Sequence, residues 1–159
     1  MQTTHHRLAT SATPQMLDEV HTLLDAVWHD APHLGPEERA RFTIVTAELV
    51  ANVCEHGAHG MPAPPWLELD VDVRGSAIHG HLTDDGREPP RGAPGGRKIT
   101  RAPADAPDPP HEYTKDEIDA IRESGRGLLL IRSASDDLAL TRVAGHNRWR
   151  YVVRPRRQR

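Results

Sequence analysis

Three features that define whole classes of protein are scarce or missing in this sequence of 159 residues. Aromatic residues make up only 4% of the chain, so a core must be built from Leu, Val, Ile and Ala. The single cysteine, Cys54, excludes an internal disulfide and a cysteine-rich zinc site. No apolar run approaches the ~20 residues of a membrane helix, and residues 1–30 contain no apolar signal segment.

The charge of the chain argues against a further class. A formal net charge of −3 does not indicate a strongly basic nucleic-acid binder. Four arginines lie in residues 154–159, which we interpret as a solvated basic tail rather than a nucleic-acid patch. We therefore expect a cytoplasmic protein that contacts neither a membrane nor a nucleic acid directly.

Hydrophobic periodicity predicts both helices and strands. Apolar residues recur at helical spacing after Thr13-Pro14 and after Gly35-Pro36, where the local residues favour helix starts. Clean alternation of apolar and polar residues predicts strands 66–74 and 77–84, joined by a two-residue turn. The expected elements are an edge strand at 6–10, helices ending near His29 and His56, the hairpin 66–84, and a final hairpin of strands 138–143 and 148–153.

Residues 86–113 have a different composition, because eleven of these 28 residues are Pro or Gly. Such a density is typical of low-complexity segments. A linker between two domains is a poor alternative, since the part that follows it is marginal for independent folding. We expect one domain over residues 1–153 that contains a long mobile loop.

Three groups of residues suggest chemistry. Glu48, Asn52 and His56 are spaced one helical turn apart, with Glu48 and Asn52 on the flank of an apolar stripe and His56 nearer its centre. A carboxylate there can orient or deprotonate a nucleophile, and an amide oxygen suits Mg²⁺. The simpler interpretation is a boundary helix with a solvated polar flank.

The second group is Asp84-Asp85-Gly86, at the end of the strand 77–84. Asp84 is in phase with Ile78 and Leu82, so its carboxylate is expected on the buried face. A buried carboxylate needs hydrogen-bond donors, which a ligand amino group would supply, and Gly86 would let a ligand ring come close. The alternative is an aspartate that merely forms a turn.

The third group, Ser124-Gly125-Arg126-Gly127, precedes an apolar helix start. Two glycines free backbone N–H groups to surround phosphate, and the start of a helix adds a favourable dipole. Taken alone, the group is better explained as a plain turn that enters a helix.

In this order, the three groups resemble the ATP-binding domain shared by gyrase and histidine kinases, the Bergerat or GHKL fold. More narrowly, residues 8–153 are similar to the anti-sigma-factor serine/threonine kinases. The resemblance implies a two-layer α/β sandwich, with a mixed, largely antiparallel sheet and helices on one face. It also implies that ATP and Mg²⁺ are cofactors.

The resemblance implies a role for each matched residue. Asn52 matches the magnesium ligand, and Glu48 matches the general base that acts on a protein hydroxyl. Asp84 matches the aspartate that hydrogen-bonds the adenine amino group, and Gly86 the glycine beside the adenine. The remaining matches are nucleotide contacts: His56 at the end of the helix motif, and Ser124, Gly125, Arg126 and Gly127 around the phosphates, with residues 87–123 as the ATP lid.

One position departs from the family pattern. In the segment Asp84 to Glu88, Glu88 stands where the family's Asp-x-Gly-x-Gly pattern has its second glycine. This departure concerns phosphoryl transfer more than nucleotide binding. The resemblance implies a homodimer that phosphorylates a Ser or Thr of an anti-anti-sigma (STAS-type) partner and otherwise binds a sigma factor. Two other hypotheses are a non-catalytic nucleotide-binding module that sequesters its partner, and a divalent-metal protein based on the eleven histidines.

Overall fold

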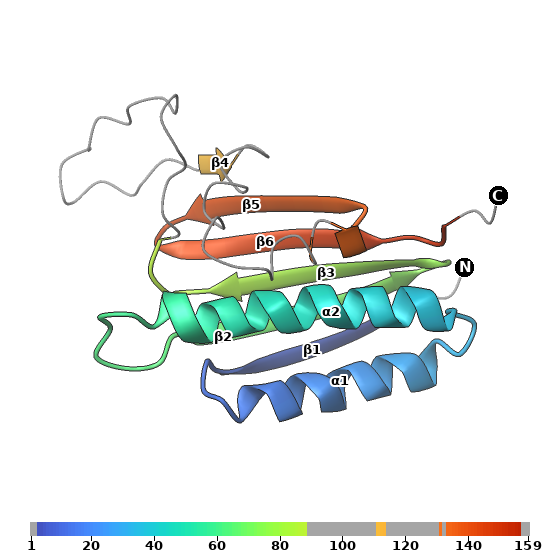
Figure 1. The fold of residues 1–159 in the computed structure, drawn as a ribbon, viewed down its shortest axis with the longest axis horizontal. Helices are drawn as coiled ribbons and strands as arrows, with labels where there is room; N and C mark the ends of the chain where they lie inside the picture. Colours follow the sequence, from blue (N-terminus) through green and yellow to red (C-terminus); the bar gives the residue numbers. More distant parts are fainter. Residues whose placement is uncertain (1–2, 89–110, 114–130, 132, 157–159) are drawn as a thin grey trace.

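The computed structural model describes residues 3–88, 111–113, 131 and 133–156, and its strands form one antiparallel sheet. The order across the sheet is β1-β2-β3-β6-β5-β4, and every strand pair among the described residues is antiparallel. Figure 1 shows this sheet with two helices beside it. The strands are β1 Thr3–Ser11, β2 Trp66–Arg74, β3 Ala77–Asp84, β4 His111–Tyr113, β5 Asp137–Val143 and β6 His146–Val153.

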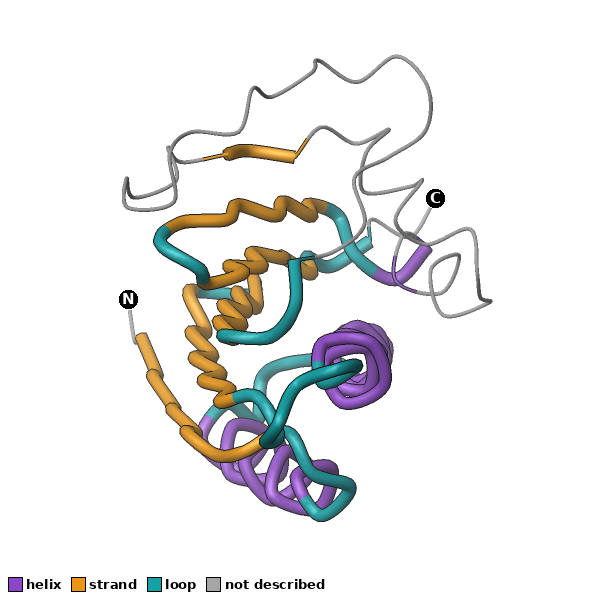
Figure 2. Tube along the Cα trace, turned by 90° about the vertical axis from the view of Figure 1, so that its left-hand side faces the viewer, coloured by secondary structure: helices purple, strands orange, loops and turns teal. Residues whose placement is uncertain are grey.

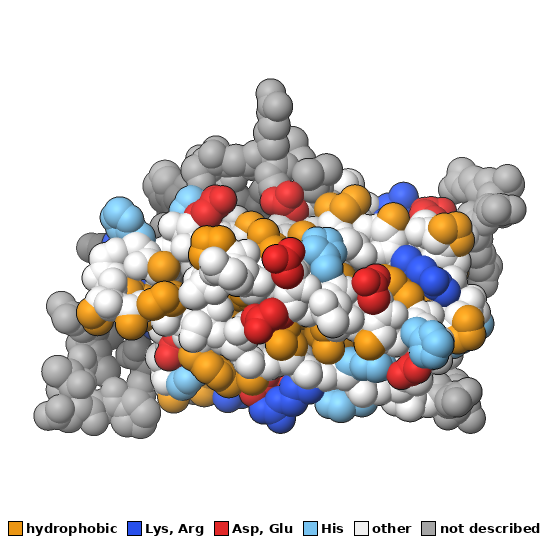
Figure 3. Space-filling model, turned by 90° about the horizontal axis from the view of Figure 1, so that it is seen from below, with side chains coloured by type: hydrophobic (Ala, Val, Ile, Leu, Met, Phe, Trp, Pro, Cys, Tyr) orange, Lys and Arg blue, Asp and Glu red, His pale blue; other side chains and the backbone are white. Residues whose placement is uncertain are grey.

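Both helices lie on the same side of the sheet, which gives the expected two layers (Figure 2). Helix α1 spans Met16–Asp30 and helix α2 spans Pro36–Asn52, followed by a π-helical turn, η1, over Val53–Gly57. Helix α1 buries a stripe at helical spacing, while its outward surface carries acidic and histidine side chains (Figure 3). Neither helix is long and apolar enough to cross a membrane, nor is any other helix among the described residues.

The predicted hairpin 66–84 is confirmed, with strand bounds as expected and Arg74 paired with Ala77 across the turn. On its outer face, acidic residues of β2 oppose histidines of β3, since Asp70 pairs with His81 and Asp72 with His79. Among the described residues, no group of three or more His, Cys, Asp or Glu side chains is placed to hold a metal ion.

Other expected elements differ in extent. The edge strand predicted at 6–10 is part of the longer β1, which pairs with β2 along its whole length. The interval 86–113 was expected to be loop, but its residues His111–Tyr113 form β4 and pair with β5 at the sheet edge. Three residues are too few to show the alternation by which strands are recognised, so periodicity gave no signal there.

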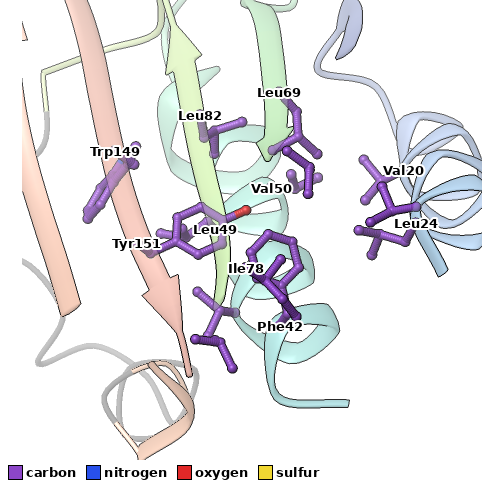
Figure 4. Close-up of a cluster of buried hydrophobic side chains, with 14 of the residues drawn as sticks. Val20, Leu24, Phe42, Leu49, Val50, Leu69, Ile78, Leu82, Trp149 and Tyr151 are labelled. Atoms are coloured by element: carbon purple, nitrogen blue, oxygen red, sulfur yellow. The ribbon is translucent and has the colours of Figure 1, made fainter. Parts of the chain in front are cut away.

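Gly80 leaves room for an aromatic ring that contacts α2. It is opposite Tyr151 in the β3–β6 pair, and the Tyr151 ring lies where a Gly80 side chain would be, 2.1 Å from an added Cβ. The Tyr151 hydroxyl is 2.7 Å from the Thr46 hydroxyl of α2, and its ring packs 5.1 Å from that of Phe42. Figure 4 shows Tyr151 and Phe42 among the aliphatic side chains between the sheet and α2.

A buried arginine fixes the first half of α2. The Arg41 guanidinium donates to the carbonyls of Ala134 and Arg154 at 3.1 and 2.8 Å and to the Asp136 carboxylate at 2.9 Å. Burial of a charge is tolerated when it is paired and hydrogen-bonded in this way. Helix α2 is therefore held to the segments that flank β5 and β6.

The packing of Tyr151 against Gly80 yields a first prediction. We expect Gly80→Ala to destabilise the protein by ~1–3 kcal/mol or more, because the added methyl overlaps a ring that fully packed neighbours prevent from moving. Thermal unfolding measures the effect. His79→Ala, on the outer face of the same strand, is the control. An unchanged melting temperature for Gly80→Ala would show that Tyr151 does not occupy this position.

Candidate nucleotide site

Glu48 and Asn52 lie one turn apart in the last part of α2, as the sequence predicts. Both side chains are half-buried. Neither makes a hydrogen bond or ion pair with any residue in the part of the chain that the structure describes.

His56 differs from the expectation. The sequence places it near the centre of the apolar stripe, but the structure shows an exposed side chain. The reason is local: α2 ends at Asn52, and His56 lies in the wider turn of η1, where α-helical spacing no longer holds. Single π-helical turns are frequent at functional sites.

Asp84 ends β3 and is almost fully buried, with 1% of its surface exposed. The predicted burial of this carboxylate is thus confirmed. Its Oδ1 accepts two hydrogen bonds, from the Gly86 backbone N–H and from the Asn147 side-chain amide, each at 2.9 Å. Its Oδ2 is buried and has no partner among the described residues. A buried carboxylate oxygen without a donor is costly, so it marks a place where a ligand donor would be favourable.

Gly86 brings the end of β3 against the end of the helix. A Cβ added to Gly86 would lie 3.1 Å from both Cα and O of Gly57 and 2.8 Å from the Asp84 carboxylate. The Arg87 backbone N–H donates to the Gly57 carbonyl at 2.9 Å. The two motifs, far apart in sequence, are therefore joined where η1 meets the loop after β3.

A hollow of about 460 Å³ opens beside this junction. It is lined by His59, Gly60 and Met61, which follow η1, and by Asp85, Gly86 and Arg87, which follow β3. Its volume is in the range of small-molecule sites. His59 and Arg87 make its lining polar, and the Arg87 guanidinium adds a positive charge.

Other predicted site residues lie outside the described residues. These are Ser124, Gly125, Arg126 and Gly127, together with most of the expected lid, 87–123. Their roles stay predictions.

The structure adds two residues that the sequence analysis did not find. Asn147 of β6 is directly opposite Asp84 and donates to its carboxylate, and Arg142 of β5 donates to the Asn147 carbonyl oxygen at 2.6 Å. Arg142 also reaches the Gly86 carbonyl at 3.4 Å. The alternation of β6 would have revealed Asn147 if the hairpin turn had been placed at Ala144-Gly145.

Burial controls the titration of the site. It raises the pKa of the Asp84 carboxyl above its ordinary value, while the hydrogen bonds from Asn147 and Gly86 and the charge of Arg142 oppose the rise. A carboxylate whose pKa is shifted by burial and by specific partners, beside an open hollow, is typical of a functional site.

Comparison with known proteins decides the family. The family model described as "Histidine kinase-like ATPase domain" matches residues 10–152 of the chain. The chain belongs to this family. Membership supports ATP binding and kinase-type chemistry in general, and the resemblance and fold class predicted from the sequence are confirmed. No curated protein matches the chain.

Two solved structures are similar to this chain. The crystal structure of the RsbU and RsbW domains of Rv1364c from Mycobacterium tuberculosis matches with a TM-score of 0.59 and 14% identity. The match covers 97% of this chain and 32% of that one, so the chain spans about a third of that protein's length. The histidine kinase domain of the blue-light activated kinase from Erythrobacter litoralis EL346 matches at a TM-score of 0.49 and 16% identity, covering 91% of this chain and 64% of that one.

Proposed function

We propose that the chain binds ATP with its adenine amino group at Asp84 Oδ2. The observation that carries this proposal is the buried Oδ2, which has no donor in the described part of the chain, at the end of a strand of a histidine kinase-like ATPase domain. An exocyclic amino group would supply the missing hydrogen bond. The absence of a side chain at Gly86, where a Cβ would press on Gly57 and Asp84, keeps the backbone accessible beside it.

Asn52 and Glu48 are proposed to act on the phosphate side of the same site. Their oxygens are half-buried and have no partner among the described residues, which fits a hard cation, so Asn52 would hold Mg²⁺ beside the phosphates. Bound Mg²⁺ would neutralise charge on the transferred phosphoryl group. Glu48 would take the proton from the hydroxyl of an incoming Ser or Thr. His56 and residues 124–127 are proposed as further nucleotide contacts.

For the biological role, we propose partner switching. The chain would phosphorylate a Ser or Thr on an anti-anti-sigma (STAS-type) protein and, in the alternative complex, bind a sigma factor, acting as a cytoplasmic homodimer. Support comes from the motif order in the sequence and from the fold shared with a protein that contains an RsbW domain.

Labelled ATP tests this proposal directly. The purified chain is incubated with Mg²⁺, ATP labelled at the γ-phosphate, and candidate STAS-type proteins, and label on the partner is followed with time. We expect transfer to one Ser or Thr of the cognate partner, abolished when that residue is replaced by Ala. Binding of ATP without transfer to any cognate partner would contradict the kinase proposal.

A second function is favoured by one residue. Glu88 occupies the position of the second glycine in the family's Asp-x-Gly-x-Gly pattern, and a carboxylate that faced the phosphates would oppose a transferred anion. A non-catalytic module that binds nucleotide and only sequesters its partner would tolerate this residue. Glu88→Gly distinguishes the two: a gain of transfer in that variant alone would favour the non-catalytic module for the natural chain.

A further inference from the structure

Asp84 does not stand alone, because a chain of hydrogen bonds reaches it from the neighbouring hairpin. Arg142 Nη1 donates to Asn147 Oδ1 at 2.6 Å, and Asn147 Nδ2 donates to Asp84 Oδ1 at 2.9 Å. The three residues come from β5, β6 and β3, which are adjacent in the sheet. Asn147 is itself buried, with 2% of its surface exposed.

The chemistry of these groups determines which one donates and which one accepts in each hydrogen bond. A guanidinium has only donors, so the Asn147 amide must turn its oxygen toward Arg142. Its NH₂ group then faces Asp84, where it also donates to the Arg87 carbonyl at 3.2 Å. Asp84 Oδ1 receives this N–H and the Gly86 N–H and is occupied as an acceptor. Any proton on the carboxyl must therefore sit on Oδ2.

The protonation state of Oδ2 decides which ligand group it can recognise. An ionised Oδ2 accepts from an amino group, as at position 6 of adenine, whereas a protonated Oδ2 donates to an oxo group, as in hypoxanthine. We propose that Arg142 and Asn147 are positioning residues that keep Asp84 Oδ2 an acceptor and so set a preference for 6-aminopurine over 6-oxopurine nucleotides. This inference rests on the proposed nucleotide site.

The surroundings of Asp84 make the preference depend on pH. Burial favours the neutral carboxyl, and so does the negative charge of Asp85, while Arg142 and the two N–H donors favour the ionised form. Because the pKa of Asp84 is raised above its ordinary value, the preference for adenine should hold at higher pH and fall as the pH drops through that pKa. Loss of Arg142 or Asn147 should move this fall to higher pH.

Two measurements on the full chain test the proposed role of Arg142 and Asn147. The first is the ratio of affinities for ADP and inosine diphosphate, measured by calorimetry over a pH series that extends from neutral pH into the acidic range. The second is the pKa of the Asp84 carboxyl without nucleotide, followed by ¹³C NMR. The variants are Arg142→Met, Arg142→Lys and Asn147→Leu. The control is Arg148→Met, which removes an exposed arginine next to Asn147 on the opposite face of β6.

We expect Arg142→Met and Asn147→Leu to lower the ADP preference at neutral pH by ~10-fold, the effect of one hydrogen bond to a charged group, and to raise the Asp84 pKa. Arg142→Lys should keep part of the wild-type ADP preference and of the wild-type Asp84 pKa. Arg148→Met should change neither the ADP preference nor the Asp84 pKa. An Asp84 pKa that is the same in the wild type, Arg142→Met and Arg142→Lys would overturn the inference. If Asn147→Leu does not fold, the Arg142 variants decide.

The experiment distinguishes failure of the proposed role of Arg142 and Asn147 from failure of the proposed nucleotide binding. A wild type that binds no ADP contradicts the proposed function, whereas a wild type that prefers ADP while all variants keep the same preference and pH profile contradicts the pair alone.

Discussion

Asp84→Asn is expected to weaken ADP binding by ~100-fold or more, the combined effect of losing a charged acceptor and of placing a donor against a donor. The substituted amide would keep its oxygen toward the Gly86 and Asn147 donors, because both demand an acceptor. Its NH₂ group would then replace Oδ2 and face the amino group of adenine. Two N–H groups directed at each other cannot form a hydrogen bond.

The same substitution should leave the free protein at least as stable. For a carboxyl whose folded pKa is raised, the unfolded chain loses its proton first as the pH rises, so stability falls between the unfolded pKa and the raised folded pKa. Asn cannot ionise, and the variant escapes this loss at neutral pH. A residue that costs stability in the free protein is typical of a binding site.

Calorimetry with ADP and thermal unfolding at neutral pH measure the two effects together. Asp70→Asn, which removes a carboxylate from the outer face of the same sheet, is the matched control and should keep wild-type affinity. Unchanged ADP affinity in Asp84→Asn would remove Asp84 from the site. A large loss of stability would mean that its carboxylate serves the fold.

Glu48→Gln should lower phosphoryl transfer to the cognate partner by ~10²-fold or more, the range for loss of a general base. The change keeps the shape of the side chain and its hydrogen-bonding capacity but removes its basicity. Nucleotide affinity should stay near the wild-type value, because Glu48 is not proposed to contact the adenine ring or the phosphates. Single-turnover transfer with labelled ATP, alongside calorimetric ADP affinity, separates the two quantities.

Asn52→Ala is the informative companion, since its position is one turn away on the same helix. It removes a hard oxygen ligand, so both the Mg²⁺ dependence of nucleotide binding and the transfer rate should fall. Glu55→Gln, an exposed carboxylate of η1, controls for charge at this end of the helix. If Glu48→Gln transfers at the wild-type rate, Glu48 is not the base.

Much of this fold follows from periodicity. The alternation of residues 66–84 predicts both strands of the central hairpin and the inward side of Asp84, because burial of one sheet face requires a period of two. Helical spacing likewise predicts α1 and α2 and the neighbouring positions of Glu48 and Asn52.

The partners of Asp84 were missed for a definable reason. Ala144 to Asn147 looked like a four-residue turn, but the turn consists of Ala144 and Gly145 alone, both with positive φ. Such two-residue turns match the twist of the flanking strands. Asn147 therefore belongs to β6 and faces the core, in register with Asp84.

His56 and Gly86 illustrate what local pattern does not contain. A π-helical turn changes the direction of His56 without any marker in residues 53–57 that a helical repeat would reveal. The close approach of Gly86 to Gly57 joins positions far apart in sequence, and its cause is tertiary packing. Propensity and periodicity describe neighbours along the chain, so such contacts require the assembled fold.

The most direct test of the nucleotide site compares two ligands that differ in one group. Calorimetric titration of the wild-type chain with Mg²⁺ and either ADP or the diphosphate of purine riboside, which lacks the 6-amino group, isolates the hydrogen bond to Asp84 Oδ2. The account predicts saturable binding of one ADP per chain, ~10-fold or more tighter than the analogue, since a buried acceptor is left unpaired by the analogue. Equal affinities, or no ADP binding, would contradict it.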